Sequence, residues 1–155
     1  MKFVFLFLGK TRERYLDQGI QDYAGRLGRF VQTEIVVLKE KHNRNSAADV
    51  VKRCDADLLL ERCQGQALKV ALDPGGRDFT SEELAALFSA WEDRGVQTVN
   101  FLLGGHLGLH ERVRQQADLV FSLSRLTFTH EMSRLILLEQ LYRGCMINAG
   151  RNYHN

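Results

Sequence analysis

Five short apolar runs, separated by longer amphipathic segments, are the feature that most restricts the fold of this chain. The runs are rich in Val and Phe, and some are apolar throughout, which is typical of strands buried on both faces of a sheet. They span residues 3–9, 34–40, 67–73, 99–105 and 119–124. Strands that alternate with helices predict an α/β fold with a parallel sheet.

The segments between the runs have the spacing of helices. Residues 11–30 and 46–64 form two of them. A third helix is expected to begin at Thr80, which can form a capping box with Glu83, and to stop at Gly95. The last helix is expected to begin at His130, with Thr129 as its cap.

Composition restricts the class of protein. The chain is 45% hydrophobic and 26% charged and has no repeat or linker, so we expect one soluble domain over residues 1–155. Cys54, Cys63 and Cys145 form no CxxC pair, which favours a reducing cytoplasm over a disulfide scaffold or a zinc site. No stretch approaches transmembrane length. We expect a cytoplasmic protein that binds neither membrane nor metal.

Three loops follow predicted strands, where parallel sheets bind their ligands: residues 73–77, 104–108 and 124–130. Two phosphate-binding motifs fail there. A P-loop ending in Lys10-Thr11 would need glycine at Val4, and a Rossmann turn at GGHLG would need glycine at Leu103. The glycine pairs can be tight turns, or they can let backbone amides approach a ligand. His106 and His110 have the spacing of metal ligands, but the intervening Gly108 and the missing HExxH motif argue against metal.

The segment 122–130 is too polar for a core strand and too apolar for an ordinary loop, as if it wrapped round an amphipathic ligand. In the helix that follows, apolar side chains point in nearly every direction, yet Arg134 and Glu139 are charged. One interpretation is a second subunit that covers the helix, with both charges paired across that contact or at a ligand. The alternative is that their long stems reach solvent. Glu139 and Arg143 have the spacing of a helical ion pair.

Taken together, LDPGG, FLLGGHLGL, LSRLTFTHEMSRLILLEQLYR and the terminal YHN resemble the bacterial large-subunit rRNA pseudouridine N3-methyltransferases. These are small members of the SPOUT methyltransferase superfamily. The resemblance runs the length of the chain and is most specific over residues 119–154. It implies a parallel α/β sheet with a C-terminal trefoil knot, a homodimer, and S-adenosylmethionine bound in the knot loops. The substrate it implies is 23S rRNA, and we expect it to be methylated within the assembled ribosome.

The resemblance also assigns site residues. The cofactor positions are Leu72, Gly104, Leu123, Ser124, Arg125, Leu126, Thr127 and Phe128. Because the N3 proton of the target must leave, a base is required, and His154 and His130 are the candidates. Arg134, Arg151, Tyr153 and His154 are the candidates for RNA binding, with Tyr153 able to stack on a splayed-out base. An abundance of arginine, 15 against 6 lysines, suits phosphate contacts but also an Arg-rich proteome.

Three departures from the family pattern lie near these residues. Thr129 and Asn152 stand where the family commonly has proline, which leaves the tail less pre-organised. Asn155 replaces a terminal basic residue and removes one phosphate contact. Two other functions remain open from the residues alone: a nucleotide- or flavin-binding enzyme of another class, and a ribosome-associated RNA binder without activity.

Overall fold

The computed structural model of this chain describes residues 1–151, apart from 42, 44 and 64. Five parallel strands form one sheet in the order β2-β1-β4-β3-β5. They are β1 (Lys2–Leu8), β2 (Gln32–Leu38), β3 (Leu68–Arg77), β4 (Thr98–Leu103) and β5 (Leu119–Phe121). The helices are α1 (Arg14–Leu27), α2 (Ala48–Arg62), α3 (Ser81–Asp93), α4 (Glu111–Gln116) and α5 (His130–Asn148). The predicted parallel α/β fold is confirmed.

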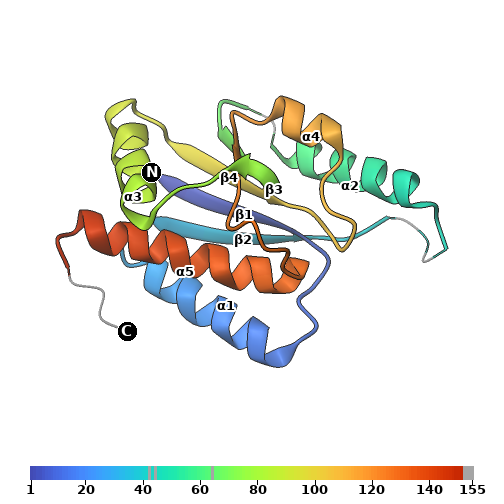
Figure 1. Cartoon of the computed structure of the whole chain (residues 1–155), viewed down its shortest axis with the longest axis horizontal. Coiled ribbons are helices and arrows are strands. Elements are labelled where there is room, and N and C mark those ends of the chain that lie inside the picture. Colours follow the sequence, from blue (N-terminus) through green and yellow to red (C-terminus); the bar gives the residue numbers. More distant parts are fainter. Residues whose placement is uncertain (42, 44, 64, 152–155) are drawn as a thin grey trace.

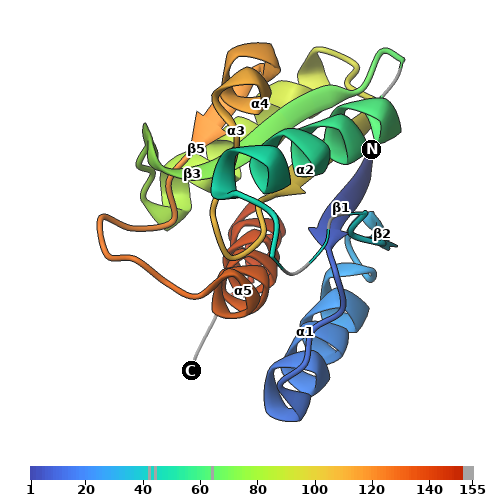
Figure 2. The same ribbon diagram turned by 90° about the vertical axis from the view of Figure 1, so that its right-hand side faces the viewer.

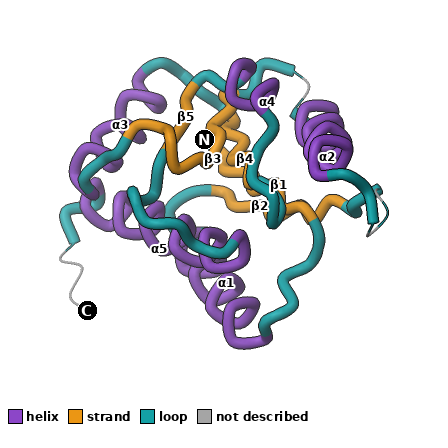
Figure 3. Tube along the Cα trace, turned by 45° about the vertical axis from the view of Figure 1, so that its right-hand side comes forward, coloured by secondary structure: helices purple, strands orange, loops and turns teal. Residues whose placement is uncertain are grey.

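Helices cover both faces of the sheet (Figures 1 and 3). Alternate residues of β1 point to opposite faces. Phe3, Phe5 and Phe7 enter a core shared with α1, α3 and α5. Val4, Leu6 and Leu8 enter a second core shared with α2 and α4. The two faces are seen edge-on in Figure 2, with α1 and α5 on one side and α2 on the other. Burial on both faces explains why the strand sequences are apolar throughout.

Most helices and strands begin and end close to the expected residues, and two differences stand out. Thr80 and Glu83 form the predicted capping box, and Gly95 has a positive φ of 72° just past α3. The short helix α4 was not expected. β3 continues through the DPGGR segment to Arg77, whereas the predicted strand stops at residue 73, and the ladder with β5 shifts register between Leu72 and Arg77.

Much of the apolar surface of helix α5 is covered by its own chain. It lies against the sheet between α1 and α3 (Figure 1). The packing is close: a Cβ at Gly144 would lie 2.7 Å from the Phe88 ring, and one at Gly19 would lie 3.0 Å from Leu135. The sequence interpretation assigned the second cover to a partner subunit. Part of that cover comes from α1 and α3, while Met132, Ile136 and Met146 of α5 stay partly exposed, and the homodimer stays a prediction.

Candidate functional site

The carboxyl ends of β3 and β4 and the segment after β5 surround one cavity of about 460 Å³, a size typical of small-molecule sites. Its wall is mainly apolar, with a few hydroxyl groups, two imidazoles and one carboxylate. The lining residues are Leu72, Asp73, Pro74, Leu103, Gly104, Gly105, His106, Leu107, Gly108, Phe121, Leu123, Ser124, Leu126, Thr127, Phe128, Thr129, His130 and Ser133. Seven of the eight residues assigned to the cofactor are among them, and Arg125 is not.

The β4–α4 loop at this cavity turns on glycines. Gly105 and Gly108 form an isolated bridge, and Gly108 has a φ of 77°. A Cβ on Gly104 would lie 2.6 Å from the carbonyl carbon of Gly108 and 2.9 Å from the amide of Leu109. Glycine is therefore required at position 104 by the chain's own backbone. This tight approach accounts for the missing side chain, and Gly104 also lines the cavity.

The DPGG segment is held against β5 in a similar way. Asp73 Oδ1 accepts the Gly75 amide at 2.9 Å, which is the turn chemistry predicted for this segment. Asp73 Oδ2 accepts a hydrogen bond from Arg114 at 3.0 Å. A Cβ on Gly76 would lie 2.6 Å from the backbone carbonyl of Val120. The chain thus places the edge of β3 in direct backbone contact with β5, and the cavity wall is fixed on that side.

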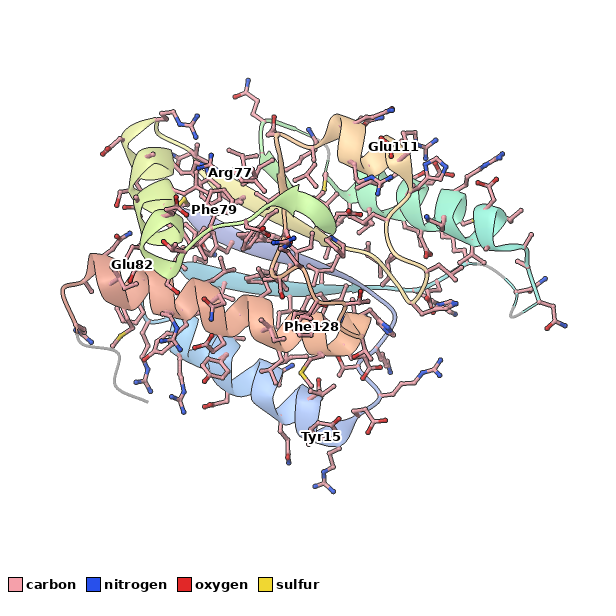
Figure 4. The ribbon with its side chains drawn as sticks, in the orientation of Figure 1. Tyr15, Arg77, Phe79, Glu82, Glu111 and Phe128 are labelled. Carbon is pink, nitrogen blue, oxygen red and sulfur yellow. The ribbon has the colours of Figure 1, made fainter. Side chains whose placement is uncertain are left out.

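The segment from Ser122 to Thr129 forms the outer wall of the cavity and is stabilised by hydrogen bonds within itself. The Ser122 hydroxyl donates to the Ser124 carbonyl oxygen at 3.1 Å, and the Leu126 amide donates to the Ser124 hydroxyl at 3.0 Å. The Leu126 side chain is 71% exposed at the rim. Phe128 lies at the N-terminal end of α5 (Figure 4), where Thr129 caps the helix by accepting the Met132 amide, as predicted.

The first turn of α5 places one titratable residue at the cavity. His130 lines it, and its Nε2 lies 3.9 Å from Glu131 Oε1. Burial first, then the charge of Arg134, lower the pKa of His130 below its ordinary value. At neutral pH its imidazole is therefore mainly uncharged and able to accept a proton. His130 is the one proposed base within the described residues.

Glu131 was missed by sequence reasoning. Its carboxylate is 7% exposed and accepts the backbone amides of Arg12 at 3.0 Å and Glu13 at 3.1 Å. Both donors lie in the loop between β1 and α1. A charged residue in the first turn of an apolar helix was the only available signal, and it reads equally well as an interaction with the helix dipole.

Arg134 is fully buried, and its partners belong to its own chain. The guanidinium donates to the Leu8 carbonyl oxygen at 2.5 Å and to the Thr11 hydroxyl at 2.9 Å, and it lies 4.7 Å above the Phe7 ring. Both terminal nitrogens of the guanidinium are satisfied within the chain, whereas its buried Nε has no hydrogen-bond partner among the described residues. Because no part of the side chain reaches the surface of the chain, it is a structural residue here, and the RNA contact suggested for it does not fit this position.

Glu139 forms its contacts with neighbouring residues of its own helix. Arg143 donates to its Oε1 at 2.6 Å, and Gln140 donates to its Oε2 at 2.6 Å. The predicted helical pair of Glu139 with Arg143 is confirmed. The two unexpected charges of the last helix thus have different causes: Arg134 ties the helix to β1, and Glu139 belongs to a half-buried ion pair on its outer side.

The residues suggested for RNA binding at the C-terminus lie away from the cavity or outside the described residues. Arg151 is exposed, its guanidinium lies 5.5 Å from the Phe30 ring, and its amide donates to the Met146 carbonyl oxygen. It therefore lies at the end of α5 opposite His130. Asn152, Tyr153, His154 and Asn155 lie outside the described residues.

Metal-binding side chains do not gather in the described part of the chain, where no group of three His, Cys, Asp or Glu residues is close enough to hold an ion. His110 caps α4, accepting the Arg112 amide at 3.1 Å. Burial raises the pKa of Cys63 to about 11 and that of Cys145 to about 12, so both thiols are protonated at neutral pH. None of the described helices is long and apolar enough to span a membrane.

Comparison with known proteins places the whole chain in one group. A family model described as "Predicted SPOUT methyltransferase" matches residues 1–154. The chain is 39% identical to the ribosomal RNA large subunit methyltransferase H of Syntrophotalea carbinolica, over 100% of this chain and 99% of that protein. It is 39% identical to the protein of that name from Desulfotalea psychrophila, over 99% of each chain. For the one from Heliobacterium modesticaldum the identity is 40%, over 95% of this chain and 94% of that protein.

Proposed function

Because this chain belongs to the SPOUT methyltransferase family, we propose that it transfers a methyl group from S-adenosylmethionine to N3 of a pseudouridine in 23S rRNA. Its full-length relatives are named as methyltransferases of the large-subunit ribosomal RNA. The observation that carries the proposal is the cavity at the carboxyl edge of the sheet, whose wall contains seven of the eight residues that the family resemblance assigns to the cofactor. Its substrate, the ribosome, makes the cytoplasm the proposed location.

The cavity suits S-adenosylmethionine in size and chemistry. Leu72, Leu103 and Phe128 offer apolar surface for an adenine ring, and the hydroxyls of Ser124 and Thr127 offer hydrogen bonds at the same wall. Tight backbone packing at Gly76 and Gly104 keeps the wall rigid. The family's trefoil knot is included in the proposal for the segment that follows β5.

The cofactor supplies an activated methyl group, so the protein needs to align donor and acceptor and to remove one proton. His130 lies on the cavity wall with a lowered pKa, which suits a group that accepts the N3 proton at neutral pH. His154 is the second candidate. Arg151 and Tyr153, with His154, are proposed to contact the RNA, the ring of Tyr153 by stacking on the target base.

The position of Arg151 links the proposed tail function to the proposed homodimer. Helix α5 has 19 residues and is therefore about 28 Å long, with the cavity at its first turn. Three further residues, from Arg151 to His154, extend at most about 11 Å. The tail of one chain is too short to reach the cavity of the same chain. If His154 and Tyr153 act on the substrate, they act at the cavity of the partner subunit.

Transfer of labelled methyl groups to ribosomal particles tests the proposal. Large subunits from cells that lack the enzyme should accept about one methyl group each, and mapping should locate it at N3 of one pseudouridine. Transcribed 23S rRNA, which contains uridine at every such position, is the matched control and should accept none. Methylation of the transcript, or of a uridine in the particle, would contradict the proposed specificity.

A further inference from the structure

A group of exposed cations follows the carboxyl ends of β1 and β2. Leu8 pairs with Leu38 at the ends of the two strands, and the Gly9 amide donates to the Leu38 carbonyl oxygen at 2.9 Å. The two segments therefore leave the sheet side by side. Their exposed basic residues, called here the basic edge, are Lys10, Arg12, Arg14, Lys39 and Lys41.

The basic edge carries a net positive charge. None of the five side chains forms an ion pair with a carboxylate of the described residues. The acidic residues of the same two segments are Glu13 and Glu40, so five positive charges stand against two negative ones. Unpaired cations on two segments that leave the sheet at the same edge create a positive potential that attracts a polyanion.

Buried charges hold the backbone of this edge in place. The amides of Arg12 and Glu13 donate to the Glu131 carboxylate, and Arg134 donates to Leu8 and Thr11. Burying two charged groups costs several kcal/mol unless each is hydrogen-bonded, and here their hydrogen bonds go to the end of β1 and the loop that follows it. The same turns of α5 line the cavity through His130 and Ser133. The loop is therefore fixed relative to the proposed methyl-transfer site.

An exposed aromatic ring completes the surface. Tyr15, in the first turn of α1, is 64% exposed. Figure 4 shows Tyr15 where α1 begins, at the same end of the molecule as Phe128 and the start of α5. Cations that contact phosphates and an aromatic ring that stacks on a base are the combination that binds unpaired RNA.

We propose that the basic edge, with Tyr15, is a docking surface for the phosphate backbone of the RNA that flanks the target nucleotide. This inference rests on the proposed function. The cations contact phosphates without reading sequence, and Tyr15 stacks on a base that is out of its helix. Glu131 and Arg134 are positioning residues, because they fix the distance between the docked RNA and the cavity.

The test replaces three cations of the edge and compares them with three at the opposite end of the strands. Lys10→Gln, Arg12→Gln and Arg14→Gln are combined in one variant. The control combines Arg29→Gln, Arg62→Gln and Arg94→Gln, exposed residues that precede β2, β3 and β4 and change the net charge equally. Affinity for large ribosomal subunits is measured as a function of salt, and S-adenosylhomocysteine affinity and thermal unfolding report on the fold.

The edge variant should bind subunits at least ~10-fold more weakly than wild type at about 0.1 M salt, with a salt dependence of log K that is flatter by about 2. The control variant should bind like wild type, and both should retain cofactor affinity and stability. Tyr15→Ala should weaken binding and slow methyl transfer, whereas Tyr15→Phe, which retains the ring, should behave like wild type.

Three results would overturn the inference. Equal weakening of both triple variants would mean that net charge matters and the edge does not. Weaker binding to subunits with unchanged binding to a naked rRNA fragment would assign the edge to a ribosomal protein. If wild type is active and the edge variant binds subunits and methylates them equally well, the basic edge has no role in RNA binding. If wild type itself methylates no rRNA, the proposed function fails, which is a distinguishable outcome.

Discussion

Arg134 and Leu8 join the last helix to the first strand: the guanidinium donates to the Leu8 carbonyl oxygen at 2.5 Å from a fully buried position. Replacing the arginine by methionine removes this donor and the one to the Thr11 hydroxyl, at about 1–3 kcal/mol for each acceptor left unpaired. We expect Arg134→Met to lower the free energy of unfolding by roughly 2–6 kcal/mol. Arg143→Met on the same helix is the control and should cost under about 1 kcal/mol. Denaturant titration compares them, and equal losses would contradict the structural role of Arg134.

Glu131 predicts a pH-dependent contribution to stability. Burial raises the pKa of Glu131, but hydrogen bonds from the amides of Arg12 and Glu13 and the charges of His130 and Arg134 outweigh it, so the pKa falls below its ordinary 4.5. The carboxylate therefore stabilises the fold above about pH 4.5, and this stability is lost as pH falls through the lowered pKa. Glu131→Gln should be less stable than wild type at pH 7, and the difference should shrink below pH 4. A difference that is constant from pH 7 to pH 3 would show that the charge is not responsible.

The family resemblance assigns both Phe128 and Arg125 to the cofactor, but the structure distinguishes them. Phe128 lines the cavity and Arg125 does not. We expect Phe128→Ala to weaken S-adenosylhomocysteine binding by about tenfold, as the loss of roughly 1.4 kcal/mol of apolar contact implies. Arg125→Ala should change the affinity by less than about threefold. Calorimetric titration measures both, and an equal loss would mean that the cofactor extends beyond the described cavity.

The role proposed for His130 predicts how the rate of methyl transfer depends on pH on the acid side. As a base it acts in its neutral form, so the rate should fall with decreasing pH only below the ordinary value of 6.5, because burial and the charge of Arg134 lower its pKa. His130→Gln should slow methyl transfer and remove this fall. His110→Gln changes the histidine that caps α4 and should leave the profile intact. An unchanged acid limb in His130→Gln would transfer the role of base to His154.

The sequence predicts this fold well where the signal is local. The five strands are evident because each apolar run is bounded by turn residues, and the Thr80 capping box lies within four positions of the chain. The six residues of α4 contain too few turns to show a period, so this helix was missed. The end of β3 was misplaced because the ladder continues past the DPGG segment after a shift in register.

Contacts between residues far apart in the sequence limit how much of the site can be predicted from the sequence. Arg134 donates to residues 126 and 123 positions away, and no pattern in the sequence indicates which atoms a lone buried arginine will contact. Glu131 was missed for the same reason. The cavity wall was anticipated through motif resemblance, since the residue types alone leave Gly104 equally consistent with a tight turn and with a ligand contact.

The short reach of the C-terminal tail gives a test of the dimer that needs no further structure. The cavity lies at the first turn of α5, and Arg151 follows its last turn, about 28 Å away. A chain lacking residues 153–155 should bind S-adenosylhomocysteine and dimerise like wild type but should not methylate ribosomes. A second variant, Thr127→Trp, keeps the tail and fills the cavity, so it should also be inactive.

Mixing the two inactive variants should restore activity if the tail of each chain serves its partner. Random exchange makes about half of the dimers mixed, and each mixed dimer has one complete site, so about a quarter of wild-type activity is expected. Sedimentation before and after exchange, near twice the 17.7 kDa chain mass, controls for assembly. If the mixture stays inactive although mixed dimers form, the tail does not complete the partner's site. Full activity of the truncated chain alone would remove Tyr153 and His154 from the reaction and leave His130 as the base.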